Sequence, residues 1–155
     1  MEIIIAVLKR VEDKLILLYN NGGEKNMWRL KVEDHFDAAH YLRGYRGKCA
    51  NMHGHTWKVE LFILDDKQDK VGITYDFKSL KEVLKELLSK YDHQCVNDVA
   101  PFDLINPTAE NISKVIYDAL CTGIELEHST LEKVRVYESP TTWAEYWNGV
   151  EKRKE

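Results

Sequence analysis

Two stretches of alternating apolar and polar side chains constrain the fold of this chain more than any other feature. In residues 28–40 the even-numbered side chains are mostly apolar and end at His40, whereas the odd-numbered ones are mostly charged. In residues 53–63 the odd-numbered positions begin with His53 and His55 and continue with large apolar residues. Because successive side chains of a strand point to opposite faces, each stretch predicts a half-buried β-strand that carries its histidines on the apolar face.

These histidines predict a metal site. His53 and His55 are separated only by Gly54 and point the same way, and two neutral imidazoles on one face suit Zn²⁺. A catalytic zinc ion commonly has three protein ligands and one open position. His40 lies on an apolar face and is the better third ligand, whereas His35 falls on a polar face. The alternative, separate core or surface histidines, stays open at this point.

Composition excludes several classes of protein. The chain has 155 residues and a formal net charge of −4, which is typical of one soluble domain without a nucleic-acid footprint. Its three scattered cysteines, without a secretory signal before them, favour reduced thiols in the cytoplasm over a disulfide framework. No apolar run approaches the roughly 20 residues that a membrane helix needs.

The remaining pattern predicts an α+β layer fold. Residues 2–19 favour a hairpin, with a helix as the alternative, so we expect an N-terminal extension over 1–27 attached to a domain over 28–155. A short strand is expected over 71–75, a helix with Phe77 in its core stripe from 77 to about 91, and a second helix from Thr108, its cap, to Gly123. Strands are expected over 132–138 and 142–147, the last with Trp143 and Trp147 on one face.

Several polar residues stand out against this pattern. Asp92-His93 places a carboxylate beside an imidazole just past a helix end, which is a weak signal alone. Glu138 shares a face with two valines, where a carboxylate is costly unless it meets a partner. Glu110 lies in the first turn of a helix, and the helix dipole is enough to explain it.

The loop over residues 42–48 is basic and contains two glycines. Its cations are Arg43, Arg46 and Lys48, directly before Cys49. Composition alone favours a solvated turn. As a hypothesis we add that these cations bind an anionic group, since Arg and Lys are common phosphate ligands.

Taken together, the motifs resemble those of the 6-pyruvoyl-tetrahydropterin synthase and 6-carboxytetrahydropterin synthase family. The residues that carry the resemblance, in chain order, are Phe36-Asp37-Ala38-Ala39-His40, Cys49 with His53-Gly54-His55, Asp76-Phe77, Asp92-His93, Pro107-Thr108-Ala109-Glu110-Asn111 and Val136-Tyr137-Glu138. The resemblance implies a tunnelling fold (T-fold), in which antiparallel sheets of several subunits close into a barrel with helices outside. It also implies a homo-oligomer, plausibly a hexamer built from trimers, with active sites between subunits.

The resemblance also implies a role for each matching residue. His40, His53 and His55 would be the zinc ligands, Cys49 the catalytic base, Asp92 and His93 the dyad that completes proton transfer, and Glu138, with Thr108 and Glu110, the anchor of the pterin ring. Arg43, Arg46 and Lys48 are not part of the motifs, and their binding of a triphosphate is our own hypothesis.

The spacing of Cys49 and His53 favours one reaction within this family. Three residues separate them, which resembles the 6-carboxytetrahydropterin synthases of queuosine-type deazapurine biosynthesis. The expected reaction converts 7,8-dihydroneopterin triphosphate into 6-carboxytetrahydropterin. Two alternatives remain, the pyruvoyl synthase reaction on the same substrate and a non-catalytic pterin-binding or zinc-stabilised structural protein.

Overall fold

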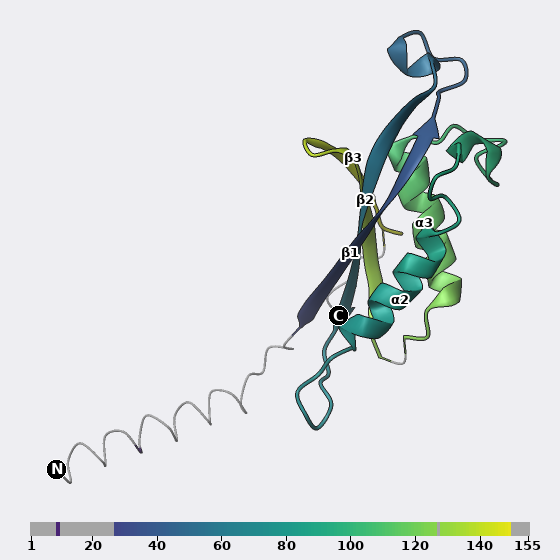
Figure 1. Cartoon of the computed structure of the whole chain (residues 1–155). Helices are drawn as coiled ribbons and strands as arrows, with labels where there is room; N and C mark the ends of the chain where they lie inside the picture. The colour runs from purple at the N-terminus through teal and green to yellow at the C-terminus, as the bar shows by residue number, and fades with distance from the viewer. Residues whose placement is uncertain (1–8, 10–26, 127, 150–155) are drawn as a thin grey trace.

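The computed structural model of the chain describes residues 9, 27–126 and 128–149. In this part the sheet has four antiparallel strands in the order β1 (Trp28–His40), β2 (His53–Asp65), β3 (Thr130–Ser139) and β4 (Thr142–Tyr146). Helices α2 (Phe77–Leu88) and α3 (Ala109–Gly123) connect β2 to β3 and cover one face of the sheet (Figure 1). The short 3-10 helices are η1 (Lys48–Ala50) and η2 (Val96–Asp98).

The predicted architecture of an antiparallel sheet with two helices on one face is confirmed. The hairpin expected over residues 2–19 and the proposed extension over 1–27 lie outside the described residues except for residues 9 and 27, so the expectation stays a prediction. No helix in the described ranges is long and apolar enough to cross a bilayer.

Strands β1 and β2 pair along their whole length and follow the predicted alternation. Their register runs without a break from Trp28 opposite Asp65 to His40 opposite His53. Even-numbered side chains of β1 and odd-numbered side chains of β2 face the helices and supply much of the core. The pair Phe36 and Trp57, both at most 1% exposed, stacks with ring centroids 6.1 Å apart.

Helix α2 begins as expected and ends earlier than expected. Asp76 is its N-cap and accepts a hydrogen bond from the backbone N–H of Lys78, which satisfies one of the free donors of the first turn. The helix ends at Leu88 instead of near residue 91, because the chain then turns, with the Tyr91 N–H bonded to the Leu88 carbonyl. Tyr91 is still buried and belongs to the core.

Two predictions near α2 are wrong. Phe77 is 52% exposed and is not part of the buried stripe, which consists of Leu80, Leu84 and Leu88. Residues 71–75 form turns and bends instead of a strand. The carboxylate of Asp69 accepts hydrogen bonds from the N–H groups of residues 71 and 73, so these donors are not available to a neighbouring strand.

Helix α3 and the last two strands agree closely with expectation. Thr108 caps α3 by accepting a hydrogen bond from the N–H of Asn111, and the helix ends at Gly123. Strand β3 is slightly longer than predicted, and β4 ends at Tyr146. Trp147 therefore lies beyond the strand, and both it and Trp143 are about half exposed (51% and 49%).

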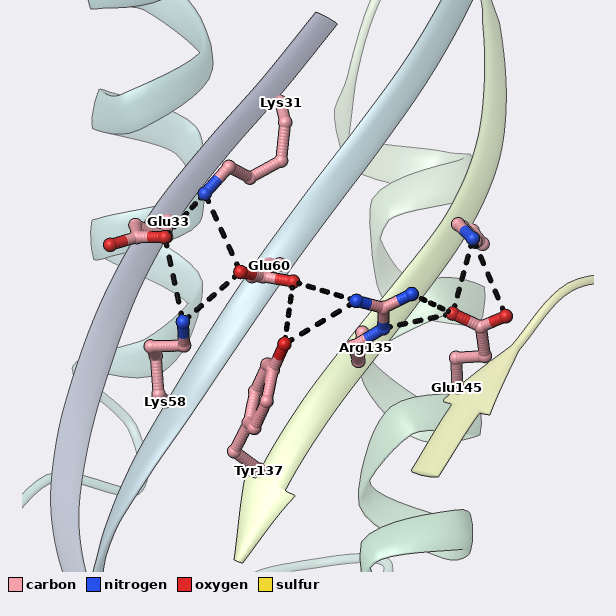
Figure 2. A network of polar contacts seen from close by, with 8 residues as sticks. Lys31, Glu33, Lys58, Glu60, Arg135, Tyr137 and Glu145 are labelled. Atoms are coloured by element: carbon pink, nitrogen blue, oxygen red, sulfur yellow. Dashed lines mark hydrogen bonds and ion pairs between the residues drawn. The ribbon is translucent and has the colours of Figure 1, made fainter. Parts of the chain in front are cut away.

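The face of the sheet opposite the helices carries a network of charges that spans all four strands (Figure 2). Glu60 of β2, whose side chain is 7% exposed, is its centre. The Glu60 carboxylate contacts Lys58 (3.1 Å), Lys31 (3.4 Å), Arg135 (3.4 Å) and the Tyr137 hydroxyl (3.3 Å). Arg135 continues the network to Glu145 of β4 at 2.7 Å. The buried Glu60 carboxylate therefore has several hydrogen-bonding and charged partners, as a buried charge requires.

We predict that Leu84→Ala destabilises the fold. Leu84 is fully buried in α2, and the cavity left by such a truncation typically costs about 2–5 kcal/mol. Denaturant unfolding should show a clearly lowered midpoint, whereas the matched change of exposed Lys85 to Ala should stay within about 0.5 kcal/mol of the parent. Equal midpoints for the two variants would contradict this description of the core.

Candidate metal centre and active site

Three histidines meet where β1 ends and β2 begins, at the end of the sheet from which the loop with η1 leaves. His40 is the last residue of β1, His53 is the first residue of β2, and the register places them directly opposite each other. His55 lies two residues further along β2, on the same face. His40 is 1% exposed, whereas the other two are half-buried. The structure therefore brings together the three side chains that were predicted to bind metal.

Hydrogen bonds fix the tautomers of two of these rings. Nδ1 of His40 lies 2.8 Å from the carbonyl oxygen of Pro107, and Nδ1 of His53 lies 2.8 Å from that of Asn51. Since a carbonyl only accepts, each Nδ1 carries the proton, and in a neutral ring Nε2 then presents a lone pair. Such second partners are usual for histidines that bind metals.

The Nε2 atoms converge in a way that suits a cation. Those of His40 and His53 are 3.0 Å apart, so two lone pairs face each other. Nε2 of His55 is buried and has no hydrogen-bond partner among the described residues. Burial also lowers the pKa of His40 and of His55, which favours neutral rings able to act as ligands. Three neutral imidazoles with convergent lone pairs fit Zn²⁺ well.

Glu138 lies beside the histidines. Its place on a strand face with two valines did not predict this contact. Its Oε1 lies 3.6 Å from Nε2 of His40 and 3.6 Å from Nε2 of His55. The ligand atoms of Glu138 and all three histidines lie within 4.8 Å of one another. The sequence predicted that this carboxylate needs a partner, and the partner in the structure is the histidine cluster.

Asp92 and His93 form a second, exposed cluster with Asp37. Nδ1 of His93 lies 2.9 Å from Asp92 Oδ2, and Asp92 Oδ1 accepts a hydrogen bond from the backbone N–H of Asp37 at 2.9 Å. The N–H of His93 donates to the Asp37 carbonyl, which helps hold His93 at a φ of 57°. The bond from the Asp37 N–H, and then that from His93, keep the pKa of Asp92 below its usual range. The dyad is thus an ionised carboxylate that orients an imidazole.

A shallow groove of about 600 Å³ connects the two clusters. Its walls include His55 from the first cluster and Asp37 and His93 from the second, together with Cys95. No local sequence pattern singles out Cys95. It reaches the groove because residues 39 and 95 form an isolated parallel bridge, a pairing that local patterns do not encode.

Cys49 lies apart from both clusters in the described residues of this single chain. It is half-buried in η1, and its backbone carbonyl accepts a hydrogen bond from the Leu42 N–H. Its thiol is not among the groups that gather within 4.8 Å in either cluster. The thiol proposed as the base is therefore not a member of the histidine cluster or of the Asp92–His93 cluster in the described residues.

The other residues proposed to bind the substrate differ in their exposure and in the hydrogen bonds that they already make. Glu110 is exposed in the first turn of α3, next to the capping residue Thr108. The guanidinium of Arg43 donates to the backbone carbonyls of Phe102, Ile105 and Asn97, so it also braces the neighbouring loop.

Arg46 and Lys48 are exposed. Of the three cations in the basic loop, these two are better placed to meet an anion.

Comparison with known proteins agrees with this geometry. Residues 29–149 match the family model described as 6-pyruvoyl tetrahydropterin synthase. The chain is 30% identical over 145 residues to the 6-carboxy-5,6,7,8-tetrahydropterin synthase of Haemophilus influenzae, covering 77% of this chain and 99% of the relative. It is 31% identical over 136 residues to the protein of the same name from Bacillus subtilis, covering 83% and 91%.

Among solved structures, the 6-pyruvoyl tetrahydropterin synthase of Caenorhabditis elegans superimposes with a TM-score of 0.71 at 25% identity. The match covers 79% of this chain and 96% of the other. This likeness confirms the predicted tunnelling fold of the subunit. The family model spans most of the chain, including both clusters, and the chain therefore belongs to the 6-pyruvoyl tetrahydropterin synthase family.

Proposed function

We propose that the protein is a zinc-dependent 6-carboxytetrahydropterin synthase of the cytoplasm. It would convert 7,8-dihydroneopterin triphosphate into 6-carboxytetrahydropterin in queuosine-type deazapurine biosynthesis. The observation that carries the proposal is the convergence of three histidine Nε2 atoms, two of them with Nδ1 fixed on backbone carbonyls. A metal-binding centre of this kind, in a chain of the pterin synthase family, supports metal-assisted chemistry on a pterin.

Each part of the site has a role in this reaction. Zn²⁺ held by the three histidines would polarise oxygens of the substrate side chain and acidify the neighbouring carbon-bound protons. Cys49, as a thiolate, would accept such a proton, because a nearby cation makes the thiolate easier to form. His93, oriented by Asp92 at 2.9 Å, would return or relay the proton.

The substrate would be held at both ends. We assign the pterin ring to Glu138, with help from Thr108 and Glu110, since a carboxylate can accept hydrogen bonds from the ring N–H and amino groups. The triphosphate would meet the basic loop. There, exposed Arg46 and Lys48 would contribute more than Arg43, whose guanidinium already donates to carbonyls.

Assembly would complete the site. The thiol of Cys49 is not part of either cluster of its own chain, and a neighbouring copy would help to complete the site around the substrate. Strands β1 and β4 are the outer strands of the described sheet, and such edges favour pairing with further copies. We therefore propose a closed homo-oligomer, plausibly a hexamer formed by two trimers.

Product identity separates this function from its nearest rival. The spacing of Cys49 and His53 and the two bacterial relatives favour the carboxy product. The likeness to the Caenorhabditis elegans enzyme supports the pyruvoyl synthase reaction as the second candidate.

Mass spectrometry of zinc-loaded protein with 7,8-dihydroneopterin triphosphate tests the choice. We expect 6-carboxytetrahydropterin, with the remainder of the side chain and the triphosphate released, and no product from metal-stripped protein. A pyruvoyl product would favour the rival, and no turnover by the zinc-loaded oligomer would contradict both.

A second prediction concerns the thiol. Cys49→Ala should keep its zinc and lose turnover by about 10²–10⁴-fold, the usual contribution of a general base. Cys121→Ala is the matched control, because Cys121 is exposed on α3 and takes no part in the proposed site. Steady-state kinetics together with metal analysis checks both variants, and near-parental turnover of Cys49→Ala would reject its role as base.

A further inference from the structure

Within residues 134–139, the part of β3 that pairs with β4, Glu138 alone has no partner. Tyr137 lies opposite Trp143, and Ser139 lies opposite Thr142, which leaves Glu138 as the extra residue of a β-bulge. Bulges commonly re-aim a side chain near a functional site. Here the bulge accompanies a carboxylate whose Oε1 is 3.6 Å from Nε2 of both His40 and His55.

The surroundings of the Glu138 carboxylate differ from those of the Glu60 carboxylate. Glu60, on the opposite face of the sheet, is surrounded by cations and a hydroxyl (Figure 2). Among the described residues, the contacts of the Glu138 carboxylate are only those with the two histidines. His40 donates through Nδ1 to Pro107, so in its neutral form Nε2 has no proton to give to Glu138. The Glu138 carboxylate and the Nε2 lone pair of His40 repel each other. A cation between them would remove this repulsion.

The distances are those of a coordination sphere. Ligands at roughly 2.0–2.1 Å from a tetrahedral Zn²⁺ lie about 3.3 Å from one another. The observed separations bracket this value, with 3.0 Å between Nε2 of His40 and His53 and 3.6 Å from Glu138 to each of two histidines. Glu138 thus stands where a fourth protein ligand would stand.

We propose that Glu138 is the fourth ligand of the metal in the substrate-free enzyme and that the substrate displaces it. This inference rests on the proposed function. A carboxylate bound to the metal is not free to hold a pterin ring, so the two roles of Glu138 would alternate. Substrate oxygens would take the coordination position, and the released carboxylate would then meet the ring N–H groups. The Glu138 side chain is 35% exposed, which leaves it room to turn.

A crystal structure of the zinc-loaded wild-type protein without substrate tests the inference directly. We expect an oxygen of Glu138 at about 2.0–2.2 Å from Zn²⁺, the usual carboxylate distance. We also expect Glu138→Gln to lower the zinc affinity by at least about 10- to 100-fold, the loss typical even for partners outside the first coordination sphere. Competition with a chromophoric chelator in the absence of substrate measures this loss.

Glu132→Gln is a closely matched control. Glu132 lies on the same strand and is also skipped by its neighbour, since Phe62 pairs with Lys133 and Ile63 with Leu131. Its carboxylate binds Arg29 instead of the histidines, so its loss should leave zinc affinity unchanged. Glu138→His adds a check that does not depend on how well the glutamine variant folds, because an imidazole can replace the carboxylate as a ligand and should retain most of the affinity.

A water molecule in the fourth position with Glu138 turned away, and parental zinc affinity in Glu138→Gln, would overturn the inference. That result would leave the three-histidine site and the proposed reaction intact. A wild-type protein that binds no zinc at all would instead reject the metal site and the inference together.

Discussion

The register between β1 and β2 is the constraint on which the rest of the structure depends. These strands pair from Trp28 opposite Asp65 to His40 opposite His53 without interruption. A slip by one residue would turn every side chain of a strand to the other face. It would expose Phe36 to water and remove His40 from His53. The same apolar contacts that stabilise the core therefore also position the histidines that we propose as metal ligands.

The histidine cluster lies at the boundary between the buried core and the solvent-exposed surface. His40 is buried and its Nδ1 is hydrogen-bonded to the carbonyl of Pro107, the residue just before the cap of α3, so the position of that helix affects His40 directly. His55 and Glu138 are only half-buried and border open space. Burial lowers the pKa of His40 and His55, while the partial exposure of His55 and Glu138 leaves room for a substrate to reach the cluster. The opposite face of the sheet is covered by the charge network around Glu60, which leaves a single apolar face to pack against the helices.

Much of the fold and of the site was predictable because their signals are local. Alternation of side chains predicted both long strands and the convergence of His40 with His53 and His55. The capping residues Asp76 and Thr108 identified the starts of both helices. These features depend on residues only a few positions apart in the chain, so they can be predicted from the sequence.

The remaining features depend on contacts between distant segments. The apolar residues 71 and 73 favoured a strand, but the carboxylate of Asp69 holds their N–H groups in a turn. Cys95 reaches the groove through its bridge with Ala39, and Glu138 reaches the histidines at a bulge. Neither the bulge nor the bridge has a pattern in sequence, because each arises from how strands and loops meet in space.

The convergence of the three histidines leads us to expect one metal centre per chain. Elemental analysis of protein reconstituted with Zn²⁺ and freed of excess metal tests it most directly. We expect about one zinc ion per chain in the wild type and a large loss of bound zinc when His40, His53 or His55 is replaced by Ala. Full retention of zinc in all three single variants, or no zinc in the wild type, would contradict it.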